Sequence, residues 1–162
     1  MGNAFIYRMP AGIAGDVTRR EHAKIEPQVM DATYPVPAFG VPVTMVGGEI
    51  RTMPLGSVYT DVYGFIVRPY PSQAESSEAL AVATPDPTKI CDILVSGYMT
   101  VLCVNGTPAK NDAVYFRNAA GTPAETIGQV EAETSADNTV LTGAVFMGAA
   151  DADGNVEIRL NI

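Results

Sequence analysis

The 162-residue chain contains no tryptophan, one histidine and two cysteines, and these scarcities limit the chemistry open to it. His22 lies in a polar segment, TRREHAK, without the nucleophile or companion ligands that catalysis or metal binding needs. We therefore expect a solvated or interface histidine. Cys91 and Cys103 lie in apolar runs and lack CxxC spacing, so we expect reduced, buried thiols and no disulfide framework.

Other catalytic and metal-binding motifs are incomplete. GIAGD (residues 12–16) lacks the glycine spacing and the lysine of a phosphate loop. DADGN (residues 151–155) lacks the remaining ligands of a calcium loop, and we predict a hairpin turn there. Glu131 and Glu133 lie two apart in a predicted strand, and we expect them on the solvated face of an edge strand. The sequence thus predicts no catalytic residue, no metal site and no cofactor.

Positive charge and long apolar runs are also scarce. The net charge of −8 argues against a nucleic-acid binder, and no run approaches the roughly twenty apolar residues of a membrane span. The first 24 residues hold four basic and two acidic side chains, a net charge of +2, so the remainder carries −10. This asymmetry is typical of a basic segment that binds an acidic partner. A chance distribution of four basic residues explains it about as well.

Proline and glycine are abundant near the N-terminus, where six of the twelve prolines fall within residues 1–54. Because proline lacks a backbone N–H and fixes φ, we expect neither a continuous helix nor a central strand there. The segment is nevertheless too apolar for a solvated disordered tail. We predict an extended arm that lies on a surface outside its own domain.

Residues 55–162 show the spacing of short strands separated by turns. SVYTDVYGFIVRPYP predicts one or two strands. A polar loop insertion follows near residues 72–89, with a short helix possible at Ala74 to Val82. Ser96-Gly97, Asn105-Gly106, Ala120-Gly121, Asp137-Asn138 and Asp153-Gly154 are predicted turns between the strands ICDILV, YMTVLCV, DAVYFRN, TIGQVEAE, TVLTGAVFMGA and NVEIRLNI. The fold class is all-β, a small antiparallel β-barrel or sandwich with a long N-terminal arm.

Several segments occur in an order that resembles the structural cement, or capsid decoration, proteins of tailed bacteriophages. These segments are PAGIAGDVTRREHAKIEPQV, then FGVPV, then VYGFIVRPYP. Within them the positions that resemble the family are Gly15-Asp16, Arg19 or Arg20, Glu26-Pro27, Gly40 to Val43 and Arg68-Pro69-Tyr70. The run GYMTVLCVNGTPAKNDAVYFRN is similar to small phage decoration domains, with less specific motifs.

The resemblance implies a non-enzymatic virion protein that binds the outer surface of the major capsid protein shell and stabilises the mature head. It implies a homotrimer near local three-fold axes, with neighbouring cement subunits as further partners and with no nucleic acid or membrane bound. The protein would be made in the host bacterial cytoplasm and act in the virion. We divide the chain into a capsid-binding arm (1–54) and a β-domain (55–162), and we assign capsid contact to Arg8, Asp16, Arg19, Arg20, Lys24, Glu26 and Phe39.

Two other functions remain open on the sequence. A carbohydrate- or receptor-binding β-domain of a phage fibre or surface protein would share the strand pattern. A small oligomeric β-enzyme of the nucleotide hydrolase type is disfavoured, because no phosphate- or metal-binding motif is recognisable.

Overall fold

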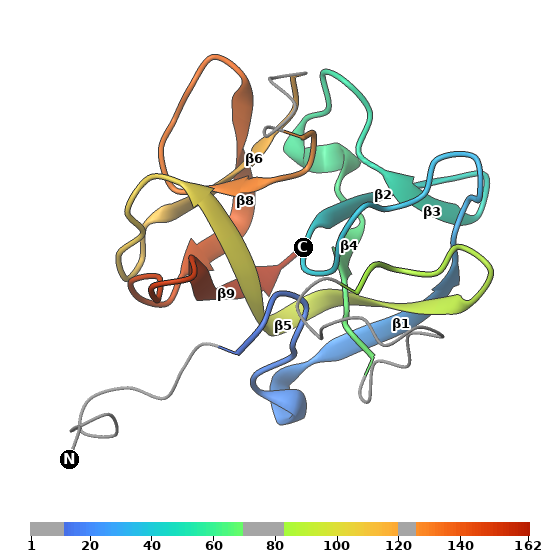
Figure 1. Ribbon diagram of the computed structural model, residues 1–162, viewed down its shortest axis with the longest axis horizontal. Coiled ribbons are helices and arrows are strands. Elements are labelled where there is room, and N and C mark those ends of the chain that lie inside the picture. Colours follow the sequence, from blue (N-terminus) through green and yellow to red (C-terminus); the bar gives the residue numbers. More distant parts are fainter. Residues whose placement is uncertain (1–11, 70–82, 120–125) are drawn as a thin grey trace.

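The computed structural model describes residues 12–69, 83–119 and 126–162, which form an all-β fold with two short 3₁₀ helices and no α-helix (Figure 1). The 3₁₀ helices are η1 (Arg20–His22) and η2 (Tyr59–Asp61). The strands in the described residues are β1 (Lys24–Val29), β2 (Pro42–Val46), β3 (Glu49–Thr52), β4 (Gly64–Ile66), β5 (Ile90–Asn105), β6 (Ala113–Arg117), β7 (Val130–Glu131), β8 (Asn138–Phe146) and β9 (Asn155–Asn161).

Five strands close into a small barrel. The second half of β5 pairs with β9 on one side and with β7 on the other, and β9–β8, β8–β6 and β6–β7 complete the circle. The β5–β7 pair is parallel and the other four pairs are antiparallel, so the barrel is mixed. Alternate side chains of β9 point inward, as the alternation in VEIRLNI predicted: Val156, Ile158 and Leu160 are buried. The predicted small β-barrel is confirmed, except that its β5–β7 pair is parallel and not antiparallel.

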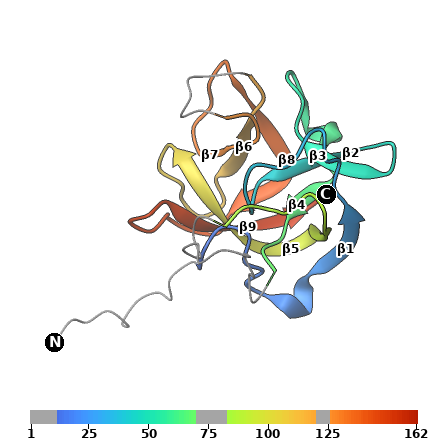
Figure 2. The same cartoon turned by 45° about the vertical axis from the view of Figure 1, so that its right-hand side comes forward.

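The first half of β5 belongs to a second group of strands. There β5 lies between β1 and β4, and β4 leads through β2 to β3. A parallel bridge from Met30 to Ile50 connects the end of β1 with β3. Figure 2 shows β5 running from these strands into the barrel, so that one strand serves two apolar clusters. Leu94 of β5 packs in the barrel cluster, whereas Ile93 and Val95 pack in the other.

The structure differs from the sequence prediction at Ser96-Gly97, which is not a turn. Residues Ile90–Asn105 form one continuous strand through Gly97, which has a φ of +138°. A Cβ at Gly97 would lie 3.0 Å from both the Ala23 Cα and the His22 carbonyl oxygen. Glycine is needed here because another part of the chain passes close to the strand, a role that the sequence signal for a turn does not distinguish.

Residues 24–52 also differ from the expected extended arm, because β1, β2 and β3 lie there and pair with the body. The prolines obey the usual rules for strands. Pro27 lies in β1, which pairs along its length only with β5 among the described residues, and Pro42 is the first residue of β2. The expectation that no central strand lies here is wrong for β2, which pairs with β3 on one side and with β4 on the other. Proline is tolerated in β2 because Pro42 is its first residue, and the apolar residues of this region pack with those of β5 in the second apolar cluster.

Glu131 is the third difference. Its side chain is fully buried in β7, where its Oε1 accepts a hydrogen bond from the Arg117 Nε at 2.8 Å, whereas the Glu133 side chain is exposed as expected.

The hairpin turn predicted at DADGN is confirmed, since the Asp151 backbone N–H donates to the Asn155 carbonyl. The possible helix at Ala74 to Val82 lies outside the described residues.

Both cysteines are free thiols in the structure. Cys91 is buried in the second cluster, and Cys103 is half-buried against the barrel cluster. Burial raises the pKa of both thiols, which disfavours the reactive thiolate form.

Candidate functional site

Residues 12–18, here called the strap, lie antiparallel along the middle of β5. The Gly15 N–H donates to the Thr100 carbonyl at 2.8 Å, and the Thr100 N–H donates to the Asp16 carbonyl at 2.9 Å. The Thr18 N–H donates to the Tyr98 carbonyl at 3.1 Å, and Val17 forms an isolated bridge with Met99. The strap is therefore fixed to the body through its backbone, immediately after the first eleven residues of the chain.

Gly15 sits in a tight socket that fixes the strap from its other side. Its φ is +94°, and a Cβ there would lie 2.7 Å from the Phe39 Cβ and 2.9 Å from the Arg68 Cβ. The Arg68 N–H donates to the Gly15 carbonyl at 2.9 Å, and the Arg68 Nε donates to the Ala14 carbonyl at 3.0 Å. The guanidinium of Arg68 lies 4.7 Å from the centre of the Phe39 ring. Burial lowers the pKa of Arg68, and nearby Asp16 partly opposes that shift.

This socket unites positions that are far apart in the sequence. Gly15, Gly40 and Arg68, which carry the resemblance noted above, meet in one place, and a Cβ at Gly40 would lie 2.6 Å from the Gly15 nitrogen. Two residues assigned to capsid contact also lie here. Phe39 is 7% exposed in the second apolar cluster, and the Asp16 Oδ2 accepts a hydrogen bond from the Ile13 N–H at 3.2 Å. In the structure both side chains help to hold the strap.

Arg19 is paired within the chain. Its Nη2 and Nε donate to the two carboxylate oxygens of Glu157 at 2.8 and 3.2 Å, and these hydrogen bonds raise the pKa of Arg19. The guanidinium lies 4.0 Å from the centre of the Tyr98 ring, and the Thr18 hydroxyl donates to the Glu157 Oε1 at 2.6 Å. The structure thus joins η1 to β9 through Arg19.

The remaining predicted residues are more exposed. Arg20 is exposed on η1 and forms no side-chain ion pair with another described residue. The Lys24 Nζ lies 2.9 Å from the Glu26 Oε1, and the Tyr63 hydroxyl donates to the same carboxylate. The hydrogen bond from Lys24, followed by the one from Tyr63, lowers the pKa of Glu26. Lys24 and Glu26 therefore pair with each other within the chain. Arg8 lies outside the described residues.

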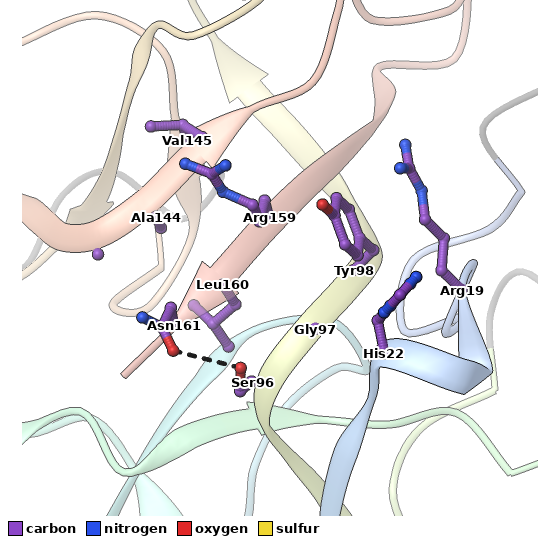
Figure 3. Close-up of a pocket in the computed structure, with 11 residues that line it drawn as sticks. Arg19, His22, Ser96, Gly97, Tyr98, Ala144, Val145, Arg159, Leu160 and Asn161 are labelled. Carbon is purple, nitrogen blue, oxygen red and sulfur yellow. Dashed lines mark hydrogen bonds between the residues drawn. The ribbon is translucent and has the colours of Figure 1, made fainter.

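A groove lies between η1 and the outer face of the β5–β9–β8 sheet (Figure 3). Its volume is about 520 Å³, and its lining residues are Arg19, His22, Ser96, Gly97, Tyr98, Gly143, Ala144, Val145, Arg159, Leu160 and Asn161. Figure 3 shows His22 of η1 and the preceding Arg19 on one side of the groove, with Arg159 of β9 across from them. His22 meets the Tyr98 ring edge-on, with ring centres 6.3 Å apart, and its side chain is 64% exposed.

Sequence reasoning missed Arg159 and Tyr98 as parts of this groove. Strand alternation places Arg159 on the outer face of β9, and the register pairs it with Tyr98. An outward arginine is ordinary for a β-strand, and the sequence carried no sign that η1 would pack beside it.

The described residues contain no group of three or more His, Cys, Asp or Glu side chains placed to hold a metal ion. Within the same ranges, no helix has the length and apolar character to cross a membrane.

Known proteins match this chain in family and in fold. The family described as structural cement protein (E217 gp24/Pam3 gp6) matches residues 1–161. The curated proteins contain no match. Among solved structures, a chain of the capsid of Myoviridae phage XM1 aligns with a TM-score of 0.67 and 17% sequence identity, over 99% of this chain and 97% of that chain. At this identity the likeness shows a shared fold.

Proposed function

The chain belongs to the phage structural cement protein family, and we propose that it binds the outer surface of the major capsid protein shell through its N-terminal region and stabilises the mature head. Membership makes it a non-enzymatic structural component of a phage capsid, located in the virion. The observation that carries the function is the family match over residues 1–161, almost the whole chain.

The strap supports a specific role for the first eleven residues. A segment that binds a partner stabilises an assembly only if it is firmly connected to the rest of its own protein. Four backbone hydrogen bonds tie Gly15, Asp16 and Thr18 to β5 and Arg68, so the residues that precede the strap start from a fixed point. We assign shell contact first to residues 1–11, which include Arg8, and to the exposed Arg20. We also retain, as part of this proposal, the wider assignment of residues 1–54 to capsid binding.

Stabilisation follows from preferential binding. A protein that binds the mature shell more tightly than any earlier form shifts the equilibrium toward the mature shell by mass action. Contacts that span neighbouring shell subunits provide that preference, because the spacing of those subunits is specific to the mature state.

We further propose a homotrimer, in which three N-terminal segments bind the shell together and gain avidity. An exposed apolar group on β1 and β5 supports a contact between copies. Ile25, Val29 and Ile90 are 39%, 52% and 72% exposed, and Val29 and Ile90 are cross-strand partners. Light scattering should give three times the 17.1 kDa of one chain. Ile90→Asp should reduce that mass, whereas Leu55→Asp, a control at a 68% exposed residue elsewhere, should not.

Deletion of residues 1–11 tests the binding proposal. Purified shells assembled without this protein are mixed with wild type, with the deletion variant, and with a variant in which residues 1–11 are scrambled. Wild type should sediment with the shells, and both variants should bind at least about tenfold more weakly with unchanged unfolding midpoints, because the strap that follows is intact. Full occupancy by both variants would overturn the assignment to residues 1–11.

Arg20→Glu tests the electrostatic part of the binding. Arg20 forms no ion pair with another described residue, so its reversal leaves the fold intact and should weaken binding, most strongly at low salt. Arg19→Glu is the less informative variant, because it places a second carboxylate beside Glu157 and disturbs η1. Shell binding that is indifferent to both Arg20→Glu and ionic strength would remove Arg20 from the contact.

A further inference from the structure

The groove between η1 and β9 contains side-chain hydrogen-bond donors for which the described residues provide no acceptor. Arg159 is exposed and forms no ion pair with another described residue. Asn161 is exposed two residues further along β9, and its Oδ1 accepts a hydrogen bond from the Ser96 hydroxyl at 3.3 Å, which leaves the NH₂ group as a donor. His22 contributes a largely exposed ring at the opposite wall. A guanidinium has five N–H donors, and no aspartate or glutamate is among the residues that line the groove.

Arg19, on the η1 side of the groove, is already paired within the chain. Glu157 accepts two hydrogen bonds from Arg19 and one from Thr18, and Arg19 also lies over Tyr98. Glu157 therefore pairs with Arg19, and within the described ranges no ion pair joins its carboxylate to Arg159. The residues that line the groove include Arg19 and Arg159 and no aspartate or glutamate, in a chain whose net charge is −8. Of the carboxylates nearby, Glu157 pairs with Arg19, and Glu21 lies 3.9 Å from the His22 Nε2. This local reversal of sign attracts an anionic group.

The shape of the groove admits part of a polypeptide. Its volume of about 520 Å³ falls within the range of about 300–1,000 Å³ typical of ligand pockets. Gly97, Gly143 and Ala144 line it with little side-chain bulk. Tyr98 and Val145 are the cross-strand neighbours of Arg159, so a tyrosine ring and a valine side chain border it on the two adjacent strands. Such surroundings strengthen a charge-assisted hydrogen bond relative to the same bond in open water.

We propose that this groove binds an aspartate or glutamate side chain of the capsid shell, with Arg159 donating to both carboxylate oxygens. The inference rests on the proposed function and adds a second contact, on the barrel, to the one assigned to the N-terminal residues. A guanidinium matches the planar carboxylate in a two-pronged arrangement, which gives direction as well as attraction. Asn161 and His22 provide further donors around the bound group.

Zero-length cross-linking identifies the partner of Arg159 directly. Arg159→Lys keeps the positive charge and introduces an amine that a carbodiimide couples to a carboxylate in contact with it. Shells decorated with this variant are treated and digested, and linked peptides are identified by mass spectrometry. We expect a link from residue 159 to an aspartate or glutamate of the major capsid protein. A link only to another copy of this chain, or no link at residue 159 in fully decorated shells, would overturn the proposal.

Binding measurements provide an independent check with a matched control. Arg159→Glu should weaken shell binding at least about tenfold, whereas Lys110→Glu, the same charge change at an exposed turn residue outside the groove, should change it less than about twofold. Both variants should unfold at the wild-type midpoint. Equal binding by wild type and Arg159→Glu would refute the groove contact alone. Failure of wild type itself to bind shells would refute the proposed function.

Discussion

Gly15 shows how one residue without a side chain holds the N-terminal strap in place. Its φ of +94° is unfavourable for any other residue, and its Cα faces the side chains of Phe39 and Arg68. Gly48, in the turn between β2 and β3, has a similar φ of +90° but nothing within 4 Å of its Cβ position. Comparing Gly15 with Gly48 therefore separates the free-energy cost of a positive φ for a residue with a side chain from the cost of crowding against neighbouring side chains.

Gly15→Ala should therefore destabilise the protein more than Gly48→Ala. Both variants incur backbone strain of about 1–2 kcal/mol, and Gly15→Ala adds about 1–3 kcal/mol because Phe39 and Arg68 must move. Urea unfolding followed by circular dichroism measures both free energies. Equal losses would show that the socket around Gly15 yields without cost.

Arg117 and Glu131 form an ion pair inside the barrel wall, with side chains 5% and 1% exposed. Asn138 donates a further hydrogen bond to the Glu131 carboxylate. Two charges removed from water are tolerated only because each is satisfied by the other and by neighbouring donors. Loss of the carboxylate leaves a buried guanidinium with its main partner removed.

Glu131→Ala should cost about 3–5 kcal/mol of unfolding free energy, the range for breaking a buried ion pair. Glu133→Ala, two residues along and exposed, should change it by less than about 0.5 kcal/mol. Chemical denaturation of the two variants gives the comparison. A loss below 1 kcal/mol for Glu131→Ala would mean that water replaces the carboxylate.

At the scale of elements, β5 is the strand on which the rest of the fold depends. Its first half pairs with β1 and β4, its second half with β9 and β7, and the strap lies along its middle.

The turn that leads into β5 is fixed by hydrogen bonds to the side chain of Asp86. Its Oδ1 accepts hydrogen bonds from the Thr88 N–H and hydroxyl at 2.9 and 2.7 Å, and its Oδ2 lies 3.1 Å from the Lys89 Nζ.

The pKa of Asp86 provides a test of this turn. Hydrogen bonds from Thr88, aided by Lys89, lower the pKa of Asp86 from 3.8 to about 2. Because the folded-state pKa is lowered, the turn contributes stability above pH 3.8 and loses it as the pH falls toward 2. NMR titration of the carboxyl group should show the low midpoint in wild type and a higher midpoint in Thr88→Ala. An unchanged midpoint in the variant would assign the shift to Lys89.

At the scale of the whole molecule, the two apolar clusters are coupled through β5. This one uninterrupted strand contributes side chains to both clusters. Ile93 and Val95 pack in the second cluster, and the barrel cluster contains Leu94, Met99 and Val101. Neither cluster keeps its boundary if β5 detaches. We infer that the clusters unfold together.

The protein should consequently unfold in one transition. Ile93→Ala and Ile158→Ala, one in each cluster, should each shift the entire transition by about 2–5 kcal/mol without splitting it. Circular dichroism and tyrosine fluorescence should coincide for both variants. Separate transitions from the two probes would show that the clusters fold independently.

Local sequence signals predicted much of the barrel but little of its surroundings. The alternation in β9 and the Asp153-Gly154 turn each depend on neighbouring residues alone, and both predictions are confirmed. Gly97 and Glu131 were interpreted wrongly because their roles depend on residues distant in the chain. His22 and Ala23 pass over Gly97, and Arg117 neutralises Glu131.

The sequence by itself determined the all-β class, the positions of most barrel strands and, through its motifs, the cement family. Strand alternation and turn residues are local, and they operate wherever the segment lies. Only the tertiary structure decided that β1–β3 join the body, that Gly15, Gly40 and Arg68 meet around the strap, and that Arg159 faces η1. Those outcomes depend on which surfaces remain to be buried once β5 is in place, and that is a property of the packed molecule rather than of any segment.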